Sequence, residues 1–202
     1  MPTNQLADLC MLVAQNGDQV AFKKIFSYFY PKLFPFVKGL LKSQESAEEV
    51  MSDVFLKLWQ SRQSLPAIQN LNYYLFVVSK HAAFDYIQKK QKIFVVSLDD
   101  LAVEFGEIKL NPEELCISAE LLNKIQQAVA ALPPNCRLIF RLVKEDGLKY
   151  REVAEMLNLS IKTVENQMSL ALSKIGSELL AANAFPHFDL SRFAKTRSTK
   201  NK

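Results

Sequence analysis

Apolar residues recur at three- and four-residue spacing along two long stretches of this chain, and this spacing limits the folds open to it. Near the start, Leu6, Leu9 and Val13 share one face of an expected helix, which Gly17 ends. The same spacing returns in segments at about 119–131, 134–145, 149–157 and 161–181. Glycine, at 5 residues of 202, is too scarce for a sheet with many tight turns. The sequence therefore predicts an all-α fold.

Capping residues set the expected helix boundaries in the first stretch. Asp18 is a favourable N-cap for a helix that continues to about residue 41, in which Pro31 and Pro35 are expected to cause a bend or an interruption. The next two helices can be capped by Ser43 or Ser46 and by Asn70 or Asn72. A polar loop is expected between these two helices, around Pro66.

Helical spacing fails between Lys92 and Ser118, where 6 acidic and 2 basic side chains accompany Gly106 and Pro112. Such a stretch is typical of an acidic flexible linker. The last 19 residues carry 5 basic side chains and 1 acidic one, as expected of a basic flexible tail. The predicted organisation is two small helical domains with a linker and a tail, at 1–91, 92–118, 119–183 and 184–202.

Several classes of protein do not fit this sequence. No apolar run approaches the roughly 20 residues of a membrane-spanning helix, so no stable membrane insertion is expected. Three widely spaced cysteines, Cys10, Cys116 and Cys136, fit reduced thiols in a cytoplasmic protein. Only His81 and His187 are histidines, and no phosphate-binding loop or metal-ligand motif is present, so we expect no enzyme activity, no cofactor and no metal site. The net charge of +4 gives only a weak general attraction for nucleic acid.

The sharpest local pattern is a predicted helix-turn-helix near the C-terminal end of the chain. Residues 150–157 fit a short helix, and Asn158 suits the left-handed conformation that the turn needs. Ala154 gives the small contact residue that two steeply crossing helices require. Ser160 can cap the second helix, whose buried stripe is expected to comprise Val164, Met168, Ala171 and Ile175. The plain alternative is a helical hairpin with a solvated polar face.

The face opposite that stripe carries side chains able to reach bases or phosphates. The set expected to contact DNA is Lys149, Arg151, Ser160, Lys162, Thr163, Asn166 and Ser169, and Glu165 lies on the same face. Asn166 is the best candidate for reading a base, because its amide can pair bidentately with adenine.

Two parts of the chain resemble the extracytoplasmic-function (ECF) sigma factors in the expected order. Residues 132–140 and 146–155 resemble region 4 of that family, and residues 47–59 resemble the most recognisable helix of region 2. The resemblance covers about 18–91 and 119–176. It implies an alternative sigma factor that binds core RNA polymerase, recognises −10 and −35 promoter elements and starts transcription of a specific gene set.

The resemblance also implies which residues do this work. Docking on the clamp coiled coil of the largest polymerase subunit would use Glu49, Ser52, Asp53 and Phe55. Opening of the −10 element would use Arg62, Asn70, Tyr73, Tyr74, Lys80, His81, Lys89 and Lys90. The helix-turn-helix set would contact the −35 element, and an anti-sigma factor is a further partner that the family suggests.

Two alternatives stay open, and only the first of them rests on a departure from the family. Relatives usually carry arginine where this chain has Leu170, which favours a degenerate sigma factor with weak promoter reading. A stand-alone helix-turn-helix regulator is the other alternative. Such a regulator would combine the helix-turn-helix with a receiver domain, in which strands and helices alternate. Residues 1–91 instead have helical spacing throughout, which argues against this alternative.

Overall fold

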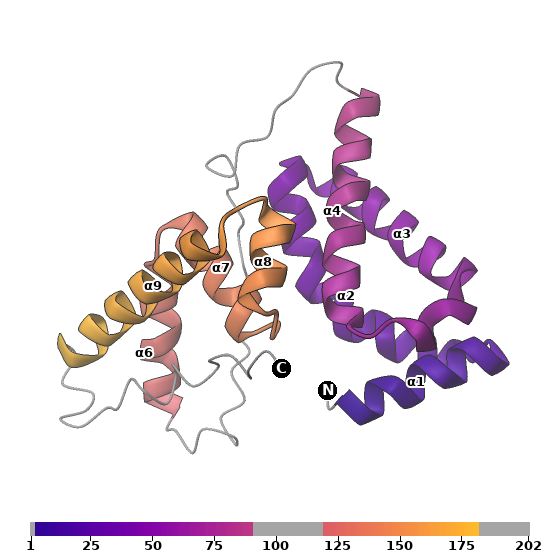
Figure 1. The fold of residues 1–202 in the computed structure, drawn as a ribbon, viewed down its shortest axis with the longest axis horizontal. Coiled ribbons are helices and arrows are strands. Elements are labelled where there is room, and N and C mark those ends of the chain that lie inside the picture. Colours follow the sequence, from indigo (N-terminus) through magenta and orange to yellow (C-terminus); the bar gives the residue numbers. More distant parts are fainter. Residues whose placement is uncertain (1–2, 91–118, 182–202) are drawn as a thin grey trace. The chain divides into compact units, whose positions relative to one another are not determined.

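The computed structural model describes residues 3–90 and 119–181, and the chain divides into two compact units, residues 1–106 and 107–202 (Figure 1). Every regular element in the described ranges is a helix, which confirms the all-α prediction. The stretches 92–118 and 184–202, predicted to be a linker and a tail, lie outside the described residues.

The first unit is built around one long helix. Its elements are α1 (Thr3–Asn16), α2 (Gln19–Leu41), α3 (Gln44–Gln60), the 3-10 helix η1 (Arg62–Ala67) and α4 (Leu71–Lys90). Helix α2 packs against α1, α3 and α4, while α1 also packs against η1 (Figure 1). The core is rich in aromatic residues, and the Phe36 and Phe76 rings meet edge to face with centroids 5.5 Å apart. Burial of such apolar surface is the main force that holds the helices together.

The expected caps of this unit form, and they explain where its helices begin. The Asp18 carboxylate accepts hydrogen bonds from the backbone N–H groups of Val20, at 2.8 Å, and Ala21, at 3.0 Å. Ser43 Oγ accepts one from Ser46 N at 3.3 Å, and Asn70 Oδ1 accepts one from Tyr73 N at 3.1 Å. Each cap satisfies a backbone donor that the helix itself leaves unbonded.

Helix α2 and the loop after α3 have three local features that the spacing of apolar residues alone does not predict. Helix α2 runs without interruption through Pro31 and Pro35. Pro31 and Ser27 both lie on the exposed side, so water can reach the Ser27 carbonyl that Pro31 cannot bond. Helix α2 ends at Lys42, which adopts the left-handed conformation with φ 53° and donates its N–H to the Lys38 carbonyl at 2.8 Å. The predicted polar loop contains η1.

The second unit consists, in its described part, of α6 (Ala119–Ala130), α7 (Pro134–Lys144), α8 (Tyr150–Leu157) and α9 (Ile161–Ala181). Helix α9 packs against the other three (Figure 1). Arg141, on α7, and Glu145, the C-cap residue of that helix, form an ion pair at 2.7 Å whose side chains are only 11% and 10% exposed. The sequence also predicted two of these helix boundaries correctly: α7 begins at Pro134, and α8 spans 150–157.

Candidate functional site

The outward face of α3 lies on the side opposite the core and is mostly polar. Glu49, Ser52 and Asp53 are exposed on it, as are Glu45 and Glu48. The Ser52 hydroxyl donates to the backbone carbonyl of Glu48 at 2.8 Å, so this residue is satisfied within its own helix. This α3 face therefore presents carboxylates that suit a basic partner surface.

Phe55 does not lie on the α3 face. Its side chain is 4% exposed, with ring centroids 4.6 Å from Phe26 and 6.4 Å from Phe22. Phe55 continues the buried stripe of Met51, Val54 and Leu58, which share its side of the helix. The resemblance grouped Phe55 with the docking residues, whereas the structure places its ring in the aromatic core.

Leu56 is the residue of the α3 face that the sequence reasoning missed. Its side chain is 54% exposed among polar neighbours. Leu56 follows Glu45, Glu49 and Ser52 at helical spacing, so periodicity alone places it on their side. An exposed leucine beside a row of exposed carboxylates gives this face both an apolar and a polar part, as protein interfaces have.

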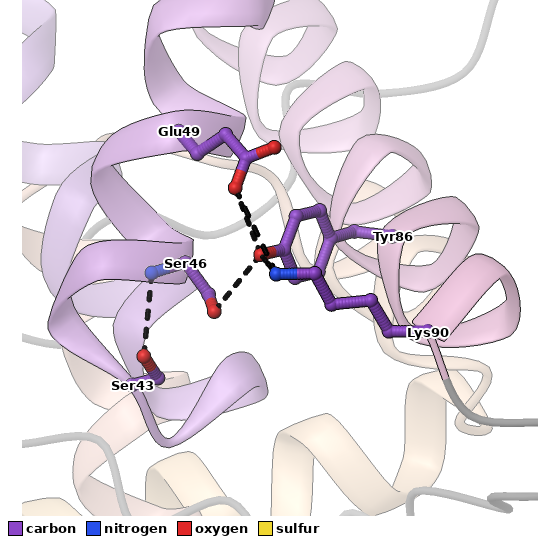
Figure 2. Close-up of polar contacts among 5 residues, drawn as sticks. All are labelled: Ser43, Ser46, Glu49, Tyr86 and Lys90. Atoms are coloured by element: carbon purple, nitrogen blue, oxygen red, sulfur yellow. Dashed lines mark hydrogen bonds and ion pairs between the residues drawn. The ribbon is translucent and has the colours of Figure 1, made fainter.

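A polar network joins the start of α3 to the end of α4 (Figure 2). The Tyr86 hydroxyl lies 2.9 Å from Glu49 Oε2 and 3.1 Å from Ser46 Oγ. Lys90 Nζ donates to the same hydroxyl, lies 4.4 Å from the Tyr86 ring centroid and 3.9 Å from Glu49 Oε2. The hydrogen bond to Tyr86 raises the pKa of Lys90, with the Glu49 charge adding a smaller effect.

The residues expected to open the −10 element occupy different sides of the first unit. Asn70 caps α4, and Tyr73 and Tyr74 are half-buried in its first turn. The Arg62 guanidinium lies against Trp59, with Cζ 5.1 Å from the ring centroid.

On α4, His81, Lys89 and Lys90 are exposed, while Lys80 is half-buried. Lys80 Nζ lies 5.5 Å from the Phe84 ring centroid, and burial lowers the pKa of this amine. Lys90 follows His81 by about two and a half helical turns, so the two point to opposite sides of α4. The structure therefore separates Lys90, which faces α3, from His81.

The helix-turn-helix forms as the spacing predicts. Asn158 ends α8 in the left-handed conformation, with φ 55° and ψ 44°. Leu159 N donates to the Ala154 carbonyl at 2.8 Å, and Ala154 is buried at the crossing. At the start of α8, Glu152 accepts a hydrogen bond from the backbone N–H of Lys149 at 2.8 Å.

The first turn of α9 is capped by a pair of hydroxyls. Ser160 Oγ accepts a hydrogen bond from Thr163 N at 3.0 Å and shares one with Thr163 Oγ1 at 2.8 Å. Lys162 Nζ lies 3.3 Å from Glu165 Oε2 on the exposed surface. Ser160 and Thr163, both expected to contact DNA, are thus hydrogen-bonded to each other. Lys162, also expected to contact DNA, forms an ion pair with Glu165.

The outer face of α9 lies opposite a buried stripe. Val164, Met168, Ala171 and Ile175 are buried, as predicted, and Leu179 is buried further along the helix. Asn166 and Ser169 are exposed on the outer face, and Leu170 is 41% exposed beside them. Lys149 and Arg151 are also exposed, near the start of α8.

Two further observations concern membrane-spanning helices and metal-binding clusters. Within residues 3–90 and 119–181, no helix is long and apolar enough to cross a membrane. The same residues hold no group of three or more His, Cys, Asp or Glu side chains that could bind a metal ion.

Two family models match the chain in the order of its two units. Sigma-70 region 2 matches residues 25–93, and Sigma-70, region 4, matches residues 122–175. These segments cover 69 and 54 of the 202 residues, more than half of the chain.

Curated relatives align across both units. ECF RNA polymerase sigma factor SigW of Bacillus subtilis is 25% identical over 161 residues, which cover 76% of this chain and 86% of the relative. ECF RNA polymerase sigma-E factor of Escherichia coli K12 is 24% identical over 186 residues, covering 88% and 96%.

Two solved structures also resemble the chain. The structure of CnrH in complex with the cytosolic domain of CnrY has a TM-score of 0.46 at 18% identity, covering 89% of this chain and 99% of that one. The sigma factor RpoE from Bartonella quintana, in a co-crystal structure with the anti-sigma factor NepR, has a TM-score of 0.44 at 20% identity, covering 78% and 96%.

A chain that joins a region 2 unit to a region 4 helix-turn-helix unit is a transcription initiation factor by class. This chain belongs to the sigma-70 family, in its ECF group of alternative sigma factors.

Proposed function

We propose that this sigma factor docks on the clamp coiled coil of core RNA polymerase through the α3 face, opens the −10 element with α4, and reads the −35 element with α9. Acting there, it would start transcription of a specific gene set in the cytoplasm. The observation that carries the proposal is the α3 face itself, where exposed carboxylates on the side opposite the core are followed along the helix by exposed Leu56. Such a surface fits a basic partner that also offers an apolar contact.

The DNA-contacting half of the proposal is supported by the placement of α9. Asn166 and Ser169 are exposed on the side opposite the buried stripe, and Lys162 is exposed nearer the first turn. Recognition helices use such N-terminal residues to contact base edges in the major groove. The small net charge of the chain means that binding to DNA should depend on the holoenzyme rather than on this chain alone.

The decisive experiment is run-off transcription from a genomic promoter library, with core polymerase alone and with added full-length chain. We expect new, specific transcripts only when the chain is present. Reversal of Glu49 and Asp53 to lysine should weaken co-purification with core polymerase and abolish those transcripts. Specific DNA binding by the chain without any association with core polymerase would instead favour a stand-alone regulator.

An anti-sigma factor remains a proposed partner on the basis of the family alone. Co-purification of the chain from its native cells, before and after induction of its target promoters, would identify such a protein. A binder that blocks association with core polymerase would support this part of the proposal. A chain that is always found on polymerase would oppose it.

A further inference from the structure

Tyr86 lies on α4, the helix expected to open the −10 element, and its hydroxyl joins that helix to the residues expected to dock on the polymerase. It contacts Glu49, on the α3 face, and Lys90, at the end of α4 (Figure 2). We infer that Tyr86 is a positioning residue for polymerase docking, which holds the Glu49 carboxylate in the orientation that the clamp recognises. The inference rests on the proposed function, because it assumes that Glu49 contacts the polymerase.

The chemistry of the four groups fixes how the protons are arranged. A carboxylate only accepts hydrogen bonds and an ammonium only donates them, whereas a phenol has one proton and two lone pairs. The single proton of Tyr86 is therefore directed to Glu49 Oε2 at 2.9 Å, with Ser46 Oγ as a second, more distant acceptor at 3.1 Å, and Lys90 donates to the phenol oxygen. Contacts from both helices thus hold the hydroxyl next to Glu49.

This arrangement leaves one oxygen of Glu49 for a partner. Tyr86 and Lys90 both contact Oε2, while the other carboxylate oxygen points away from them (Figure 2). The Glu49 side chain is 61% exposed, and a long exposed side chain normally loses rotamer freedom when it binds. A carboxylate that is already held loses less, so its contact with a basic partner is stronger.

The same unit contains a matched control. On α2, Lys32 Nζ donates to the Tyr28 hydroxyl at 3.2 Å and lies 4.4 Å from its ring centroid. This pair has the same four-residue spacing and ring distance as Tyr86 and Lys90, but it involves no acidic residue of α3. Tyr28→Phe therefore removes an equivalent hydroxyl without changing Glu49.

The experiment is a double-mutant cycle on the affinity of the full-length chain for core polymerase. Tyr86→Phe keeps the ring that packs on Lys90 and removes only the hydroxyl. We expect it to weaken binding about threefold to tenfold, the range for one side chain left to be ordered on binding. Ser46→Ala should weaken binding less and in the same direction, and Tyr28→Phe should leave it unchanged. In a Glu49→Gln background, Tyr86→Phe should have no further effect.

Each outcome has a distinct meaning. Equal weakening by Tyr86→Phe with and without Glu49→Gln would show a merely structural role and overturn the inference. Wild-type affinity for either Tyr86→Phe or Glu49→Gln would also overturn it, while the chain would still be a polymerase subunit. Failure of the wild-type chain to bind core polymerase would sink the proposed function itself. Thermal unfolding of every variant checks that the helices remain folded.

Discussion

The guanidinium of Arg62 lies over the indole ring of Trp59, 5.1 Å from its centroid, and Arg62 Nη1 donates to the Trp59 carbonyl at 3.3 Å. The side chain also lies beside Gly17, where a Cβ atom would be 3.7 Å from Arg62 Nε. Arg62 thus ties η1 to the end of α3 and to the turn between α1 and α2. This position was expected from the family to serve the −10 element, and the structure adds a packing role.

Replacement of Arg62 should therefore affect stability as well as promoter opening. We expect Arg62→Ala to lower the free energy of unfolding by about 1 kcal/mol, because a partly buried cation over an indole ring contributes about that much. Urea unfolding followed by Trp59 fluorescence measures the change. Exposed Gln63→Ala, the next residue in η1, is the control and should have almost no effect. Unchanged stability in Arg62→Ala would leave the residue with a DNA role alone.

Ser79 offers a stabilising change. It is fully buried on α4, and its hydroxyl has no hydrogen-bond partner in the described structure. A buried polar group without a partner costs about 1–3 kcal/mol relative to water. Ser79→Ala should therefore raise the free energy of unfolding by about 1 kcal/mol, measured by urea titration. A loss of stability would mean that the hydroxyl is satisfied in solution, for example by a bound water molecule.

The buried ion pair of α7 should matter far more than the exposed one on α9. Arg141→Met leaves the Glu145 carboxylate in a largely buried position, which should cost about 3–5 kcal/mol. Glu165→Ala removes the exposed pair with Lys162 and should cost less than about 1 kcal/mol. Circular dichroism during thermal unfolding compares the two variants. Similar losses would show that burial does not govern the strength of these pairs.

Ser160 allows helix capping to be separated from DNA binding. Ser160→Ala removes the cap on Thr163 N and should cost about 1 kcal/mol of stability. Ser160→Asp keeps a capping oxygen, so stability should change by less than about 0.5 kcal/mol, but its charge should repel DNA phosphates. Promoter affinity of the holoenzyme should then fall for Ser160→Asp at nearly wild-type stability. Wild-type affinity would argue that the start of α9 lies away from DNA.

Asn166, Lys162 and Leu170 should differ in the kind of DNA contact they make. Asn166→Ala should lose about 1–3 kcal/mol at one base position and relax the preference there. Lys162→Ala should weaken binding equally on all promoter sequences and reduce the salt dependence. Leu170→Arg should strengthen −35 binding if the helix docks as in relatives. Holoenzyme binding to a promoter library tests all three, and no change in any of them would favour a degenerate sigma factor.

The sequence predicted those features that depend on neighbouring residues. Asp18, Ser160 and Asn158 act at helix ends as their side-chain chemistry requires, because caps and turns are local. Phe55 was expected at core spacing from periodicity and in docking from the resemblance, and its burial agrees with the periodicity. The same periodicity places Leu56 on the outer side of the helix.

The contact of Tyr86 with Glu49 was beyond the reach of the sequence. The two residues are 37 positions apart, on different helices, and no spacing rule connects them. Their contact depends on how α3 and α4 pack, which the side chains of the core decide together.

Lys42, at the end of α2, shows where this sequence is not optimised. A left-handed backbone with φ 53° suits glycine or asparagine, and a lysine there is strained. Selection removes changes that drop a protein below its working stability, but it does not perfect every position above that level. A substitution at the end of α2 can therefore raise the stability of the chain while its α3 face and its α9 outer face stay unchanged.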